Sequence, residues 1–102
     1  MEYDLLIKNG SVIDGTGSAT KQADLGIKDG IIVSIGQVEG EALETIDAKD
    51  LVVSPGFIDI HTHFDPQLCW DGYATPSIEH GITTVVTGNC SLSLAPIKGK
   101  ED

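Results

Sequence analysis

Residues 57–63 read Phe-Ile-Asp-Ile-His-Thr-His, and residues 82–87 read Ile-Thr-Thr-Val-Val-Thr. The apolar start of the first stretch and the β-branched run of the second each predict a strand. Between them, Thr75–His80 has the pattern of a brief helix, with its threonine as N-cap, Pro76 in the first turn and Gly81 at its end. Strand, loop, short helix and strand within about 30 residues predict one βαβ unit, whose two strands run parallel.

The chain before residue 55 has a different pattern, in which short alternating runs are separated by turn residues. Asn9-Gly10 and Asp29-Gly30 each lie between apolar runs, and such pairs signal a hairpin because both residues accept positive φ. Apolar residues alternate on both sides of Asp29-Gly30, as a sheet with one solvent-exposed face requires. We therefore expect a small antiparallel β-sandwich-like domain of about six strands over residues 1–54, followed by an α/β domain over residues 55–102.

The length and charge of the chain exclude several classes of function. The chain has 102 residues, too few for a complete (β/α)8 barrel of at least about 200 residues. Its 16 acidic and 6 basic residues give a formal charge of −10, and the basic residues are all lysines. Without arginine it lacks the clustered positive charge and bidentate donors that nucleic acids require. The same charge opposes binding to anionic membranes, so no nucleic-acid and no membrane partner is expected.

The cellular compartment is indicated by the start of the chain and by its cysteines. The first residues are acidic where a secretory signal carries bases, and no apolar run approaches the roughly 20 residues of a membrane span. Two cysteines are too few for a disulfide scaffold. We therefore expect a protein of the reducing cytoplasm.

His61 and His63 follow directly on the predicted strand 57–60. On extended backbone, residues two apart project to the same face, about 6–7 Å from one another. Two imidazoles so placed can bind one metal ion, such as zinc, through bonds of about 2.0–2.1 Å. The histidines are therefore candidate metal ligands, the alternative being two surface side chains that happen to alternate. Asp59 lies on the same face and could orient a ligand.

Cys90 strengthens the metal interpretation, because it lies just past the second predicted strand. The ends of neighbouring parallel strands lie about 4.8 Å apart and can contribute to one site. A thiolate is a strong zinc ligand, whereas a cysteine by itself is more often a small buried apolar residue. Cys69, in a polar loop, is expected to be no ligand. His80 is expected to have a structural role at the end of the short helix.

Several stretches resemble the metal-dependent amidohydrolase superfamily. Residues 53–63, Val-Ser-Pro-Gly-Phe-Ile-Asp-Ile-His-Thr-His, look like the opening of its barrel, and residues 4–10 and 27–32 look like the small β-domain that precedes it. A narrower resemblance is to the N-acyl-D-amino-acid deacylase branch, through residues 61–65, 70–71, 76–77 and 80–90. In this last segment, His80 through Cys90, the Gly-Asn-Cys element singles out the branch.

The resemblance implies a zinc hydrolase of linear amides, built on a (β/α)8 barrel and carrying one or two zinc ions in the whole enzyme. His61 and His63 would be the ligands from the first strand and Cys90 the ligand from the second. The metal would polarise the amide carbonyl of a small N-acyl amino acid substrate and acidify the attacking water. An aspartate late in the barrel would act as general base.

The chain departs from the family in two respects. Ser91 stands where the branch usually has glycine. After Cys90 the chain has no histidine, and its only acids are Glu101 and Asp102. We therefore expect no catalytic residue within this chain, weak zinc binding or none, and no deacylation by the chain alone. Because the family completes its β-domain with strands from the far C-terminus, we also expect exposed strand edges and a homo-oligomer.

Two alternatives remain at this point. The chain could be a stand-alone acidic β-domain that oligomerises or binds a partner and carries a vestigial metal motif. Within the same class of enzymes, the parent could be a cyclic amidase or a deaminase. The sites of such enzymes typically lack a cysteine on the second strand, so Cys90 favours the deacylase branch.

Overall fold

The computed structural model describes residues 2–91 of the chain. The chain divides into two compact units, Met1–Pro55 and Gly56–Asp102. Between residues 2 and 91, no helix is long and apolar enough to cross a membrane.

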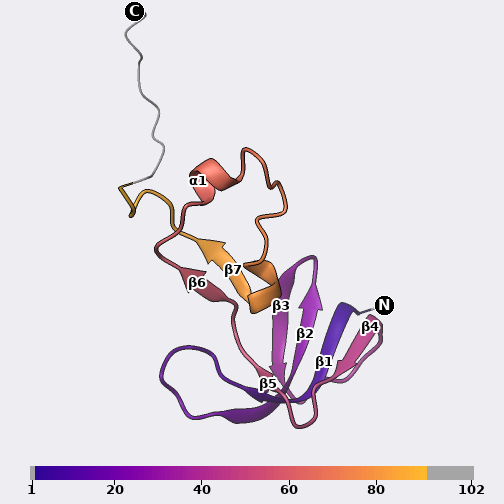
Figure 1. The fold of residues 1–102 in the computed structure, drawn as a ribbon. Coiled ribbons are helices and arrows are strands. Elements are labelled where there is room, and N and C mark those ends of the chain that lie inside the picture. The colour runs from indigo at the N-terminus through magenta and orange to yellow at the C-terminus, as the bar shows by residue number, and fades with distance from the viewer. Residues whose placement is uncertain (1, 92–102) are drawn as a thin grey trace, which may run out of the picture. The chain divides into compact units, whose positions relative to one another are not determined.

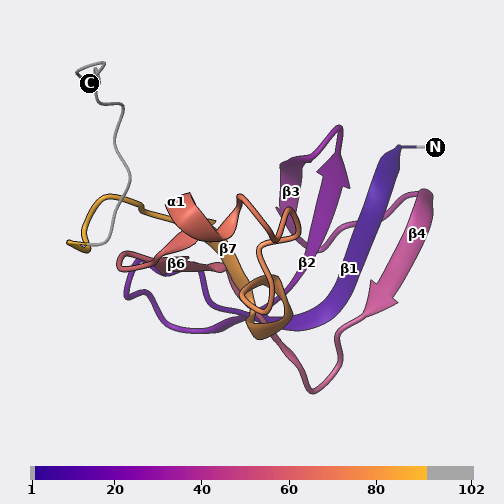
Figure 2. The ribbon, with the colours of Figure 1, turned by 45° about the horizontal axis from the view of Figure 1, so that its top comes forward.

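The first unit is a five-stranded sheet in the order β3-β2-β1-β4, with β5 pairing the far end of β1 (Figure 1). Figure 2 shows β3, β2, β1 and β4 side by side. The longest strand, β1, pairs with β2, β4 and β5 and so organises the sheet. The strands are β1 (Tyr3–Val12), β2 (Lys21–Lys28), β3 (Ile31–Gly36), β4 (Ala42–Asp47) and β5 (Val52–Val53).

The hairpin predicted at Asp29-Gly30 is confirmed. It joins the antiparallel strands β2 and β3, and its two residues have φ of 51° and 74°. A two-residue turn of this kind requires positive φ at both positions, which aspartate and glycine tolerate. The local chemistry of these two residues therefore determines this connection.

The hairpin predicted at Asn9-Gly10 is wrong, because β1 continues through both residues. The register shifts from Ile7 opposite Leu25 to Gly10 opposite Ala23, so one extra residue is inserted in β1. Asn9 has φ 64°. A bulge uses the same positive φ as a turn but keeps the strand running in one direction.

The expectation of an antiparallel, sandwich-like domain is also wrong. Both β4 and β5 run parallel to β1, and the five strands of the first unit form a single mixed sheet. Parallel neighbours need a crossover between them. Here residues 37–41 carry the chain from the end of β3 to the start of β4, and Val38 in that segment is 2% exposed.

A buried carboxylate joins this crossover to the sheet. Asp24, on β2, accepts hydrogen bonds from Lys8 Nζ at 2.8 Å, from the backbone N–H of Asn9 at 2.8 Å and from that of Val38 at 3.2 Å. These donors, led by the Lys8 ammonium, lower the pKa of Asp24 from 3.8 to about 2. Leu6 of β1 and Leu25 of β2 are among the buried apolar residues of this unit.

The alternation of buried and exposed residues predicted for residues 31–35 does not hold. Leu25 of β2 is buried, but the apolar residues of β3 are all exposed, whichever face they occupy. They are Ile31, Ile32, Val33 and Ile35, with exposed fractions between 53% and 64%. β3 is an edge strand of this sheet, and its apolar side chains remain more than half exposed.

The second unit has two parallel strands, β6 (Phe57–Asp59) and β7 (Ile82–Val85), which confirms the predicted parallel pair. Both strands end one or two residues earlier than predicted. Between them lie a short helix that the sequence did not predict, α1 (Phe64–Gln67), and a single 3-10 turn, η1 (Ile78–His80) (Figure 1).

The helix predicted for Thr75–His80 is shorter than expected and begins later. Its N-cap is Ser77, and Thr75 precedes a cis peptide bond to Pro76. Thr75 donates both its N–H and its hydroxyl to the carboxylate of Asp71, at 2.7 and 2.8 Å, and so belongs to the preceding loop. The predicted end is confirmed, since Gly81 has the left-handed φ of 82°.

Candidate metal centre

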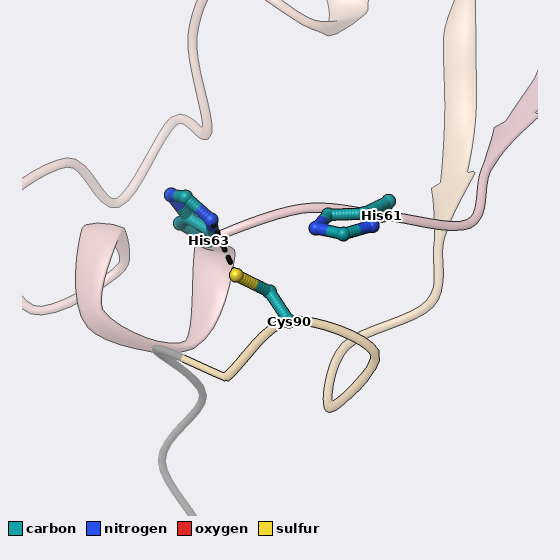
Figure 3. A group of neighbouring side chains, drawn as sticks. All are labelled: His61, His63 and Cys90. Carbon is teal, nitrogen blue, oxygen red and sulfur yellow. Dashed lines mark hydrogen bonds between the residues drawn. The ribbon is translucent and has the colours of Figure 1, made fainter.

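The candidate site lies where the two strands of the second unit end. β6 and β7 are parallel, so their C-terminal ends meet at the same edge of the pair. His61 and His63 follow β6 at this edge, and Cys90 lies in the loop after β7. Figure 3 shows the three side chains gathered there, the two histidines from one segment and Cys90 from another.

The structure brings the three predicted ligands together. Their donor atoms all lie within 4.8 Å of one another. His63 Nε2 lies 2.8 Å from Cys90 Sγ, within hydrogen-bond distance (Figure 3). The two imidazole rings are 6.3 Å apart at their centroids and tilted by 57°. Both histidines are exposed and Cys90 is half-buried, so the group can be reached from solvent.

The backbone geometry behind this convergence differs from the prediction. The strand ends at Asp59, and His63 has the N-cap position of α1 with φ −110° and ψ 30°. The histidines therefore project from a loop and a helix start, not from extended backbone. Their rings lie 6.3 Å apart on this short loop at the end of β6.

The donor set fits zinc in chemistry and in spacing. Imidazole nitrogen and cysteine sulfur are the donors that tetrahedral zinc prefers. On one such ion, two nitrogens lie about 3.4 Å apart and a nitrogen and a sulfur about 3.6 Å. The present separations reach these values through side-chain shifts on the order of 1 Å, which rotamer adjustment supplies. His61, His63 and Cys90 would hold such an ion and leave room for a further ligand.

Two side chains fix the backbone around His61. Asp59 Oδ1 accepts the backbone N–H of His61 at 3.1 Å, so Asp59 holds the main chain of a candidate ligand and not its ring. Asn89 donates its side-chain amide to the carbonyl oxygen of Ile60 at 2.8 Å. The ligand spacing in the sequence does not single out Asn89, although its place next to Cys90 is a signal.

The remaining candidates lie outside the donor group. Cys69 is exposed, and its sulfur contacts the backbone carbonyl of Asp65 at 3.9 Å. His80 is exposed in the last turn of η1. The carboxylate of Asp71 organises its own loop, and hydrogen bonds led by the Thr75 hydroxyl lower its pKa. None of these residues joins His61, His63 and Cys90 in the part of the chain that the structure describes.

Comparisons with known proteins agree with one another. The sequence profile of the family described as "Amidohydrolase family" matches residues 44–99. A D-aminoacylase of Alcaligenes xylosoxydans xylosoxydans is 48% identical over 96 residues, which cover 93% of this chain and 20% of the relative. The chain therefore spans about a fifth of the length of this curated relative.

Two solved structures are similar in fold as well as in sequence. A D-aminoacylase whose binuclear metal center has been studied superimposes with a TM-score of 0.86 and 45% identity, over 95% of this chain and 21% of that one. An N-acyl-D-glutamate deacylase from Bordetella bronchiseptica, complexed with zinc and a phosphonate inhibitor, has a TM-score of 0.80 and 42% identity, over 94% of this chain and 20% of that one.

Proposed function

The chain belongs to the amidohydrolase family, and on that premise we propose that it is part of a zinc-dependent hydrolase of linear amides of the N-acyl-D-amino acid type. The observation that carries the proposal is the convergence of His61, His63 and Cys90 within 4.8 Å at the ends of two parallel strands. The similarity to a D-aminoacylase and to a zinc-bound deacylase supports the choice of metal and of substrate class.

We further propose that residues 1–54 are the small β-domain of such an enzyme and residues 55–102 the beginning of its barrel. A parallel strand pair with helical turns between its strands is the repeating element of a (β/α)8 barrel. Enzymes with this fold carry their sites at the C-terminal ends of the strands. The three donors of this chain occupy that position.

His61, His63 and Cys90 are the residues proposed to hold the metal. When bound there, zinc supplies Lewis-acid polarisation of an amide carbonyl and a bound water of lowered pKa. The imidazoles must be neutral to bind, and Cys90 must lose its thiol proton, so binding releases protons and weakens in acid. The exposure of both histidines leaves room for a substrate on the solvent side.

The same three donors do not complete a deacylase site. Amide hydrolysis needs a general base that takes a proton from the attacking water and passes it to the leaving amine. Within residues 2–91, no carboxylate lies among the three donors. We therefore propose that the chain binds metal but is inactive alone, and that the base and further ligands come from polypeptide outside these 102 residues.

Calorimetric titration of the 102-residue chain with zinc tests this proposal. We expect one weakly bound zinc ion per chain, together with release of protons, and no hydrolysis of N-acetyl-D-amino acids by the loaded chain. No zinc binding would overturn the ligand assignment and favour an acidic binding or oligomerising module with a vestigial motif. Hydrolysis by the chain alone would overturn the proposal that the general base lies elsewhere.

We also propose that isolated chains self-associate through β3. This edge strand exposes four large apolar side chains and carries no charged residue, so its open backbone groups can pair with a second copy. Light scattering coupled to gel filtration is expected to give a dimer or larger species, and Val33→Lys a monomer. A wild-type monomer at micromolar concentration would contradict this proposal.

A further inference from the structure

The peptide group that joins Ile60 to His61 is held at both of its polar ends by side chains. Its N–H, which belongs to His61, donates to Asp59 Oδ1 at 3.1 Å. Its carbonyl oxygen, which belongs to Ile60, accepts from Asn89 Nδ2 at 2.8 Å. Asp59 is the last residue of β6, whereas Asn89 lies in the loop after β7.

Holding both ends of a peptide group restricts the residue that follows it. The group is planar, and its C=O and N–H point in opposite directions in the trans form. Rotation of the plane therefore breaks both hydrogen bonds at once. Because this plane sets where the Cα of His61 lies, the two bonds fix the point from which its imidazole projects.

The hydrogen bond from the Asn89 side chain to the Ile60 carbonyl joins the two segments past the point where the backbone pairing of β6 and β7 ends. The backbone hydrogen bond from Val86 N–H to the Asp59 carbonyl, at 2.8 Å, lies at the end of this parallel pair. Past that point, the Asn89 amide links the two loops that carry the candidate ligands. Since Asn89 directly precedes Cys90, the link holds the Cys90 loop against the backbone of His61.

We propose that Asn89 is a positioning residue of the candidate metal centre, which sets the placement of Cys90 relative to His61 through the Ile60–His61 peptide group. This inference rests on the proposed role of the three donors. Asn89 contacts a backbone carbonyl and is not itself in the donor group. The link requires a side-chain N–H donor on a short side chain. Alanine has no such donor, and glutamine has one on a side chain that is longer by one methylene group.

Cobalt(II) titration of the chain tests the proposal, because a thiolate bound to cobalt gives a charge-transfer absorption that reports Cys90. We expect the wild type to show this band, and Asn89→Ala to bind cobalt about 10–100-fold more weakly with a reduced band per bound ion. Asn89→Gln should recover part of both. The matched control is Gln67→Ala, which removes side-chain amide bonds to the Thr75 carbonyl at 2.7 Å and to Asp71 at 3.3 Å but no side chain of the donor group.

The outcomes separate this inference from the proposed function. No cobalt binding by the wild type contradicts the proposed metal site itself. Binding and absorption in Asn89→Ala that equal those of the wild type contradict the positioning role alone. An equal loss in Gln67→Ala would show that any loosening of this unit has the same effect, and would also overturn the inference.

A second measurement needs no metal. In the metal-free chain, NMR hydrogen exchange at the His61 amide should be at least several-fold faster in Asn89→Ala than in the wild type, because the peptide plane is then held at one end only. The His61 amide of Gln67→Ala should exchange at the wild-type rate. Unchanged exchange in Asn89→Ala would overturn the proposal. Asn89 is exposed, so its truncation leaves no cavity, and far-UV circular dichroism checks the fold.

Discussion

Cys90→Ala is expected to weaken zinc binding by more than about 100-fold, because it removes one of three donors and leaves both imidazoles in place. Changes in groups that only support a ligand already cost about 10–100-fold in metal affinity, so the loss of a ligand should cost more. The thiolate is also the one donor of the three that brings a negative charge to the dication, since both imidazoles bind in the neutral form.

Competition of each variant with a chromophoric chelator at constant pH measures this effect. The matched control is Cys69→Ala, which removes the other cysteine of the chain, an exposed residue outside the donor group. Its zinc affinity should equal that of the wild type. Unchanged affinity in Cys90→Ala, or an equal loss in both variants, would show that Cys90 is not a ligand.

Asp24→Ala is expected to lower the free energy of unfolding of the first unit by about 2–4 kcal/mol. The change removes the acceptor of three hydrogen bonds at a buried position, from Lys8 Nζ and from the N–H groups of Asn9 and Val38. Buried donors left without an acceptor cost about 1–3 kcal/mol each, and part of this is recovered where water reaches Lys8. Such a loss is a large share of the stability of a small unit.

The pH dependence of the free energy of unfolding distinguishes the contribution of the charged Asp24 carboxylate from that of side-chain packing. The pKa of Asp24 in the folded chain is about 2, below its ordinary 3.8, so its contribution is complete above about pH 4 and is lost as the pH falls toward 2. Urea unfolding followed at several pH values should therefore show a shallower loss in acid for Asp24→Ala than for the wild type. Parallel curves for the two proteins would contradict this role of Asp24.

Asp4→Ala is the matched control for this experiment. Asp4 also accepts from a lysine, Lys28 at 3.1 Å, and from a backbone N–H, that of Asp29. Both partners of this ion pair are more than a third exposed, whereas the Asp24 side chain is 13% exposed. Exposed ion pairs contribute little, so the loss of stability should be much smaller for Asp4→Ala.

The two pairs of turn residues show how far sequence determines this fold. Asn9-Gly10 and Asp29-Gly30 have the same chemistry, yet the first makes a bulge and the second a hairpin. Positive φ is a local property, and the sequence predicts it correctly at Asn9, Asp29 and Gly30 but not at Gly10. Whether the chain then reverses direction depends on pairing partners far away in sequence. Asn9 lies between β2 and β4, where its backbone N–H donates to Asp24 and its side-chain amide donates to Asp47.

The parallel strands of the first unit could not be predicted from local pattern. Residues 37–41 have no periodicity that predicts a crossover, and the backbone of Val38 is held there by bonds to Asp24 and Lys8, which are distant in sequence. In the second unit the sequence predicts the strand β7 and the end of η1 more accurately, because a β-branched run and the left-handed glycine Gly81 are strong local signals.

The donors of the candidate site were identifiable from residue type and spacing, but their geometry was not. The strand ends at Asp59 and His63 begins α1, whose four residues are too few for a helical period to be recognised in the sequence. Asn89 contacts a backbone carbonyl, and a contact of this kind cannot be recognised from the spacing of residues in the sequence. The side chains that can bind a metal are thus recognisable in the sequence, whereas the groups that position them, such as the Asn89 amide, are not.

The strand order also bears on the sequence of events during synthesis. The β2–β3 hairpin closes through a two-residue turn and can form as soon as residue 36 has been made. Pairing of β1 with β4 must wait for residues 42–47, because a parallel neighbour is reached only after the crossover. We therefore expect the nascent chain to carry a hairpin, with β1 paired on one side, before Val38 reaches the position that joins its backbone to Asp24.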